Sequence, residues 1–201
     1  MSDPETRPSD GDRALLDAAD RAMSRYAEGD ARAFETVFSA IGTRIYKFLR
    51  RLSGSDELAR DLLQETLLRM HQARGAFRSG SAVLPWAYTI ARNVFLDSAR
   101  ARRRRPRGVP LEEPGNELPV PADAESSLLA RQSAAVVERA LAQMTEARRE
   151  AFVLLRFEGL SVATAAEILG VSENAVKLRA FQAYEILRDE LARLEAGRRA
   201  R

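Results

Sequence analysis

The chain has 201 residues, of which 45 % are hydrophobic and 30 % charged, a composition typical of one or two small globular domains. It contains no cysteine and one histidine, which excludes disulfides, thiolate metal sites, a cysteine nucleophile and the common histidine metal sites. No apolar run is long enough to cross a membrane, and a chain without cysteine fits a reducing cytoplasm. Because no glycine-rich phosphate loop or nucleophile elbow is present, we expect no catalytic residue, no metal and no cofactor.

The formal net charge of +3 is unevenly distributed along the chain. Residues 1–107 carry a net charge of +6, residues 108–130 of −5, and residues 131–201 of +2. A basic, acidic and again basic series predicts two modules that bind an acidic partner and a connecting segment that does not.

The N-terminal half is expected to be a helical domain over residues 13–105, preceded by a disordered leader over residues 1–12. Turn residues at 29–30, 53–55 and 78–81 divide this domain into helices. The helix before the second turn has apolar side chains at three- and four-residue steps, which we expect to be buried: Phe34, Phe38, Ile41, Ile45, Phe48, Leu49 and Leu52.

Two further helices complete this domain. Ser55 or Asp56 is suited to cap a helix over residues 57–73, and a helix over 84–104 tolerates Pro85 in its first turn. The next segment, residues 106–125, is acidic, contains five prolines and shows no periodicity, so we interpret it as a flexible linker.

Helical periodicity resumes at residue 126 and continues to residue 195, and no strand-like alternation occurs anywhere. The fold class is therefore expected to be all-α, with two small helical domains joined by the linker. Within the second domain, Ser161 is placed to cap a short helix, Gly170 to form a turn with positive φ, and Ser172 to cap a longer helix. This layout is typical of a helix-turn-helix.

The helix that starts after Ser172 has two distinct faces. We expect one stripe to be buried: Val176, Ala180, Ala183, Leu187, Leu191 and Leu194. The opposite face carries polar and basic side chains together with Leu178 and Phe181, which need a partner on a short domain. Contact with base edges and thymine methyl groups is one such partner, and a plain amphipathic helical hairpin is the alternative.

The last helix of the first domain combines aromatic and basic residues. Six arginines lie between Arg100 and Arg107, more than the helix dipole calls for, which indicates phosphate contacts. Trp86 and Phe95 are either core residues or platforms on which unstacked bases stack. In the preceding helix, Asp61 and Glu65 form an acidic pair that favours a protein partner with a basic surface.

Three segments resemble the extracytoplasmic-function sigma factors of the sigma-70 family, and the resemblance extends from Ala27 to Leu194. They are DLLQET at residues 61–66, LPWAYTIARNVFLDSARARRRR at 84–105 and FEGLSVATAAEILGVSENAVKLRAFQAYEILR at 157–188. These segments resemble, respectively, the family's region 2.2, regions 2.3 and 2.4, and region 4.

The resemblance implies a function in transcription initiation: the chain directs core RNA polymerase to specific promoters and assists their opening, while catalysis belongs to the polymerase. The first domain is then sigma region 2, the domain over 126–195 is sigma region 4, and the acidic linker passes through the RNA channel of the polymerase. The implied partners are the β′ clamp and β flap of core RNA polymerase, promoter DNA and an anti-sigma factor. The implied location is the cytoplasm.

The resemblance also assigns site residues to three surfaces. The residues expected at the minus-ten element are Trp86, Tyr88, Arg92, Asn93, Asp97 and Arg100. The residues expected at the minus-thirty-five element are Asn174, Lys177, Leu178, Arg179, Phe181 and Gln182. The residues expected to contact core polymerase are Asp61, Leu62, Gln64 and Glu65.

The sequence departs from the family pattern at two DNA-facing positions, because family members often have serine where Leu178 stands and arginine where Gln182 stands. The promoter sequence therefore cannot be copied from a relative.

Two rival functions use fewer of these features. A conventional helix-turn-helix repressor or activator leaves the aromatic and arginine-rich helix without a role, and a protein-interaction module that sequesters another regulator does not need two basic surfaces.

Overall fold

The computed structural model describes residues 10–104 and 124–199, and all the regular structure in them is helical. The expected all-α fold class, with two helical regions, is confirmed. The leader was predicted to extend to residue 12, but the first helix begins at Asp10. The rest of that leader and nearly all of the predicted linker, residues 106–123, lie outside the described residues.

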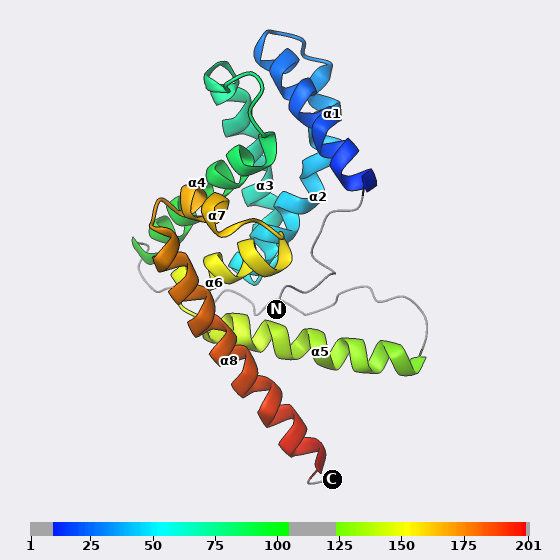
Figure 1. The fold of residues 1–201 in the computed structure, drawn as a ribbon, viewed down its shortest axis with the longest axis vertical. Helices are drawn as coiled ribbons and strands as arrows, with labels where there is room; N and C mark the ends of the chain where they lie inside the picture. The colour runs from blue at the N-terminus through cyan, green and yellow to red at the C-terminus, as the bar shows by residue number, and fades with distance from the viewer. Residues whose placement is uncertain (1–9, 105–123, 200–201) are drawn as a thin grey trace.

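The first region is a bundle of four helices followed in chain order from the N-terminus (Figure 1). They are α1 (Asp10–Ala27), α2 (Ala33–Ser53), α3 (Asp56–Ala73) and α4 (Val83–Arg104), with a short 3₁₀ turn at Arg74–Ala76. Helix α2 is central, since α1, α3 and α4 all pack against it.

The buried stripe of α2 matches the predicted one with a single exception. Six of the seven predicted residues are buried or partly buried, but Phe38 is exposed. Its ring lies against Gly42 on the surface of its own helix, while neighbouring Val37 takes the core position. Large core side chains such as Phe48 and Leu49 are fully buried, and truncating one to alanine is expected to cost about 2–5 kcal/mol.

The second region contains α5 (Ala124–Gln143), α6 (Glu146–Phe152), α7 (Val162–Leu169) and α8 (Glu173–Arg199). A π-helical turn at Val153–Phe157 continues α6. Helix α8 packs on α5, α6 and α7 and extends beyond residue 195, where its end was predicted.

The predicted helix caps are present. The hydroxyls of Ser55, Ser161 and Ser172 each accept a hydrogen bond from the backbone N–H three residues later, at 3.3, 3.0 and 3.3 Å. Gly170 has φ +65°, the left-handed conformation that glycine adopts without strain. Helices α7 and α8 therefore form the expected helix-turn-helix.

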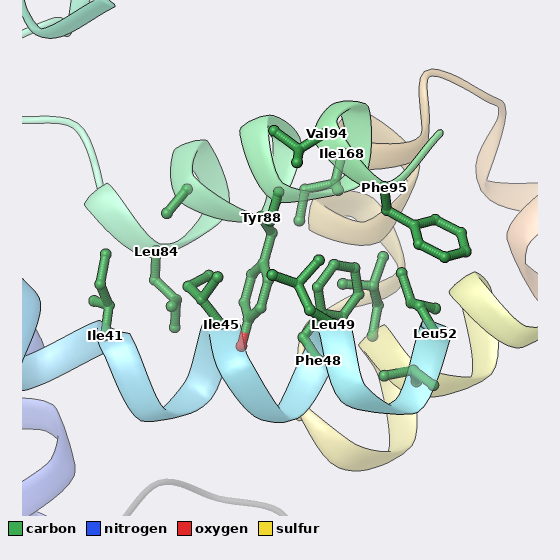
Figure 2. Packing of buried hydrophobic residues seen from close by; sticks show 14 of the residues in the cluster. Ile41, Ile45, Phe48, Leu49, Leu52, Leu84, Tyr88, Val94, Phe95 and Ile168 are labelled. Atoms are coloured by element: carbon green, nitrogen blue, oxygen red, sulfur yellow. The ribbon is translucent and has the colours of Figure 1, made fainter. Parts of the chain in front are cut away.

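The two regions pack directly against each other. Helix α7 lies beside α4, and α6 with its π turn lies beside α2 (Figure 1). Their buried residues form one hydrophobic cluster, and Figure 2 shows Ile168 of α7 among the side chains of α2 and α4. The sequence predicted two small helical domains joined by a linker and gave no relative placement for them, and in the structure their buried residues share one core.

Candidate nucleic-acid and polymerase interfaces

Helix α4 carries the predicted minus-ten residues, but it places them in two different environments. Trp86 is partly buried and packs edge-on against Phe77, with the ring centroids 5.2 Å apart. Asn93, Asp97 and Arg100 are exposed on the side of α4 that leads to its arginine-rich end. This exposed group is accessible to a ligand in this conformation.

Tyr88 is fully buried, with 0 % of its surface exposed. Its ring packs at a steep angle on Phe48 of α2, at 5.0 Å between centroids, and its hydroxyl donates a hydrogen bond to Glu158 (Figure 2 shows the position of the ring). Burial, together with the charge of Glu158, raises the pKa of Tyr88 far above its ordinary value, so the hydroxyl keeps its proton. The predicted DNA contact of Tyr88 does not occur in this conformation, because Tyr88 is part of the core.

Arg92 also turns toward the second region instead of toward solvent. Its Nε donates to the Glu150 carboxylate at 3.0 Å, and the Glu150 side chain is only 2 % exposed. Burial raises the pKa of Glu150, while the ion pair with Arg92 opposes that rise. Arg92 and Tyr88 are thus both bound by glutamates of the second region.

A surface network links α3 to the exposed part of α4. Arg69 donates to Glu65 at 2.8 Å and to Asp97 at 2.8 Å, and Asp97 also accepts from Arg100 at 3.3 Å. The hydrogen bonds to both carboxylates raise the pKa of Arg69. The network therefore holds a predicted polymerase residue and two predicted minus-ten residues in one arrangement.

The structure exposes most of the residues of α3 that were predicted to contact core polymerase. Asp61 and Gln64 are exposed and Glu65 is half-exposed, but Leu62 is buried in the core of the bundle. Leu62 cannot contact a partner in this structure, because its side chain points from α3 into the bundle. Sequence reasoning did not single out Leu68, which is exposed and lies one helical turn after Glu65 on the same face.

The outward face of α8 largely matches the prediction. Asn174 and Lys177 are exposed, and the apolar side chains of Leu178 and Phe181 are 58 % and 62 % exposed. Arg179 and Gln182 are half-buried. On the opposite stripe, Val176, Ala180 and Ala183 are buried and Leu187 and Leu194 are partly buried, but Leu191 is exposed, contrary to prediction.

Gln182 has a partner that the sequence did not reveal. Its amide oxygen accepts a hydrogen bond from the Nε of Arg148 on α6, at 2.9 Å. The amide oxygen of Gln182 is therefore bound to α6, and its amide nitrogen is the group left to donate a hydrogen bond elsewhere.

Two glutamates that are buried where the two regions meet, Glu150 and Glu158, were also missed in the sequence. Glu158 ends the apolar run that contains the π turn; besides the Tyr88 hydroxyl, its carboxylate meets Arg51 at 3.5 Å. The Arg51 guanidinium lies 4.1 Å from the centroid of the Phe157 ring. Burial raises the pKa of Glu158, although Tyr88 and Arg51 oppose the rise. The signal in the sequence is slight: Glu158 directly follows residues 151–157, a run that is apolar except for Arg156.

The arrangement defines a class: a helical transcription factor with an arginine-rich helix in one region and a helix-turn-helix in the other. Residues 37–105 match sigma-70 region 2 and residues 134–187 match sigma-70 region 4. The chain belongs to the sigma-70 family, among the extracytoplasmic-function sigma factors.

Similar proteins include RNA polymerase sigma factor CarQ of Myxococcus xanthus, which is 34 % identical over 86 % of this chain and 97 % of its own length. ECF RNA polymerase sigma factor SigM of Mycobacterium tuberculosis is 34 % identical over 86 % of this chain and 82 % of its own length.

Two solved structures share the fold. Sigma factor RpoE in complex with the anti-sigma factor NepR from Bartonella quintana has a TM-score of 0.67 and 27 % identity, and covers 81 % of this chain and 98 % of its own. CnrH in complex with the cytosolic domain of CnrY has a TM-score of 0.65 and 25 % identity, covering 87 % and 97 %.

The chain is a transcription initiation factor that binds core RNA polymerase and promoter DNA and confers promoter specificity. Among the helices within residues 10–104 and 124–199, none combines the length and apolar character needed to span a membrane.

Proposed function

We propose that α4 binds and helps to open the minus-ten element, that α8 reads the minus-thirty-five element, and that α3 docks on the β′ clamp of core polymerase. The observation that carries the proposal is the exposed group Asn93, Asp97 and Arg100 beside three further exposed arginines at the end of α4. The arginines suit phosphate contacts, and an amide beside them suits capture of an unstacked base.

Trp86 has a supporting role in this proposal. Because its ring packs on Phe77, it holds the start of α4 in place and offers only its remaining exposed edge to DNA. Tyr88 and Arg92 take part in DNA binding only after region 4 has moved away from α4, since both are bonded to region 4 glutamates.

On α8, different side chains serve different purposes. Lys177 and Arg179 supply positive charge for phosphates or guanine, and Asn174 supplies an edge contact. Leu178 and Phe181 suit thymine methyl groups, because large apolar side chains this exposed gain most from a desolvated contact. Region 4 is proposed to contact the β flap in addition.

Helix α3 presents acidic and amide side chains with Leu68 beside them, which suits a basic protein surface with an apolar spot. Asp61, Gln64 and Glu65 are the residues proposed to contact the clamp.

A promoter-opening assay tests the assignment of α4. With core polymerase and run-off templates, Asn93→Ala should reduce permanganate reactivity at the minus-ten element while leaving the melting temperature unchanged, since Asn93 is exposed. Trp86→Ala is the comparison, because loss of its packing should lower stability by several kcal/mol, about 3–5 for a well-packed ring. Unchanged reactivity in Asn93→Ala would remove the base-capture role.

The same purified protein separates this function from its rivals. A promoter-specificity factor should bind promoter duplex only when core polymerase is present, whereas a conventional helix-turn-helix regulator should bind duplex unaided. We propose also that an anti-sigma factor binds this chain in the cytoplasm. The support is that both similar solved structures are complexes of this kind.

A further inference from the structure

The amide of Gln182 on α8 is held by an arginine of the neighbouring helix α6 (Figure 1). The Nε of Arg148 donates a hydrogen bond to the Gln182 amide oxygen at 2.9 Å, and both residues are half-buried. Arginine has only donors, so the amide atom that meets it must be the oxygen and not the nitrogen. The orientation of the Gln182 amide is thus set by the chemistry of its partner.

The side chain of Arg148 is not part of an ion pair. Within residues 10–104 and 124–199, Gln182 is its one hydrogen-bonding partner and no carboxylate pairs with its guanidinium. Nearby arginines differ in this respect, since Arg92 pairs with Glu150 and Arg103 with Glu146. A stabilising ion pair therefore does not account for Arg148, whose charge is directed at an uncharged amide.

Gln182 belongs to the face of α8 that is proposed to read the minus-thirty-five element. It directly follows Phe181 and comes one helical turn after Leu178, and both of these apolar side chains are exposed. Lys177 is exposed on the same face. A change in the hydrogen bonding of the Gln182 amide therefore changes what this face can recognise.

A free glutamine amide reads adenine through two hydrogen bonds on one base edge. Its oxygen accepts from the adenine N6 amino group, and its nitrogen donates to N7. In this chain Arg148 binds the oxygen and turns it toward α6. The oxygen keeps a second lone pair, but the guanidinium beside it repels the positive end of another N–H donor. The two-bond contact with adenine is therefore disfavoured.

The amide nitrogen of Gln182 is left as a donor. Donors find acceptors on adenine, thymine and guanine, and they are opposed by the amino group of cytosine. A charged donor on the amide oxygen also polarises the amide, which strengthens its N–H groups as donors.

We propose that Arg148 is a positioning residue for promoter recognition. By holding the amide oxygen of Gln182, it limits Gln182 to donating hydrogen bonds, so that Gln182 discriminates against cytosine and does not single out adenine. Arg148 touches no base itself and acts through Gln182, from a helix 34 residues earlier in the chain. This inference rests on the proposed assignment of α8 to the minus-thirty-five element.

Selection from a promoter library, with core polymerase and the full-length chain, tests the proposal. Gln182→Ala first identifies the base position that residue 182 reads, where its logo departs from that of the wild type. At this position Arg148→Met, which keeps the apolar stem and removes every donor, should raise the preference for adenine about tenfold, within the range of a bidentate base contact. Arg148→Lys keeps a charged donor and should retain the original preference.

The double variant Arg148→Met with Gln182→Ala separates positioning from direct DNA contact. If Arg148 acts through Gln182, the double variant should have the logo of Gln182→Ala alone. The matched control is Arg188→Met, which removes the same charge from an exposed position on α8 and should leave the logo unchanged. If Arg148→Met instead weakens all promoters equally and flattens the salt dependence, Arg148 is a phosphate contact and the proposal is wrong.

A second measurement uses the wild-type chain and does not depend on the folding of any Arg148 variant. Promoters with adenine at the identified position are compared with promoters that carry purine there, the analogue without the 6-amino group. A Gln182 that only donates should bind both within about twofold, whereas a two-bond contact should lose about tenfold. Gln182→Ala on the same templates corrects for the weaker base pair, and a tenfold loss in the wild type overturns the proposal.

These experiments distinguish failure of the inference from failure of the assignment on which it rests. If Gln182→Ala leaves every position of the logo unchanged, Gln182 reads no base, and its assignment and the role of Arg148 fail together. If Gln182→Ala changes the logo and Arg148→Met does not, the role of Arg148 fails while the assignment of α8 stands.

Discussion

Replacing Tyr88 with phenylalanine tests whether its hydroxyl serves the fold or the promoter. The substitution removes one oxygen and keeps the ring that packs on Phe48. It takes away the hydrogen bond that the hydroxyl donates to the buried carboxylate of Glu158. Because both groups are buried, no solvent molecule replaces the lost donor without rearrangement.

The size of the effect depends on the surroundings of Glu158. A hydrogen bond to a charged group contributes about 1.5–3 kcal/mol. Arg51 stays 3.5 Å from the same carboxylate and compensates for part of the loss. We therefore expect Tyr88→Phe to lower the free energy of unfolding by about 2 kcal/mol, near the lower end of that range.

Urea unfolding followed by circular dichroism measures the loss. With a slope of about 2 kcal/mol per molar urea, the midpoint should fall by about 1 M at unchanged slope. In a Glu158→Gln background the same substitution should cost about 1 kcal/mol, because a neutral hydrogen bond contributes less. If Tyr88→Phe changes the free energy of unfolding by less than about 0.5 kcal/mol, the scatter typical of surface substitutions, this reasoning is refuted. The hydroxyl would then be assigned to DNA contact, as the sequence predicted.

Three further predictions concern the other surfaces. Glu65→Lys should abolish pull-down of core polymerase by a protein that remains folded, and retained pull-down would leave α3 without its assigned partner. Gln182→Arg, selected against a promoter library, should shift one position from adenine or thymine toward guanine, by about 1–3 kcal/mol of discrimination; identical logos would mean that residue 182 never reaches a base. Stability should depend on pH: burial raises the pKa of Glu150 and Glu158 in the folded chain, so folding takes up protons. The stability that this adds is complete below the ordinary value of 4.5 and is lost as pH rises through the raised pKa, so the free energy of unfolding measured in urea should fall with rising pH more steeply in the native chain than in the double variant Glu150→Gln with Glu158→Gln; an equal pH dependence in the two chains would contradict it.

Local features of the fold were predictable because local chemistry determines them. Ser55, Ser161 and Ser172 cap their helices as expected, since a cap depends on a side chain and a backbone group three residues apart. Gly170 was predictable for the same reason, because a tight turn between two helices calls for positive φ.

Features that depend on distant segments were not predictable. Periodicity placed Phe38 and Leu191 on buried stripes, and both predictions are wrong, because the neighbouring helices leave these side chains exposed. The bonds of Tyr88 and Arg92 join residues 70 and 58 positions apart in the chain, and no pattern within one helix reveals such a partner. The sequence therefore located α4 as a site and missed that region 4 covers part of it.

The π turn at Val153–Phe157 has a geometric consequence for the direction of Glu158. In this turn the N–H of Glu158 bonds to the carbonyl of Val153, five residues back, where an α-helix would bond four residues back. Each residue added to a helix rotates the rest of the chain by about 100° around the helix axis, so a chain with one residue fewer here would turn its carboxylate about a quarter of a circle away from Arg51 and Tyr88. The number of residues in this short segment, independently of their identity, thus sets the direction in which the glutamate points.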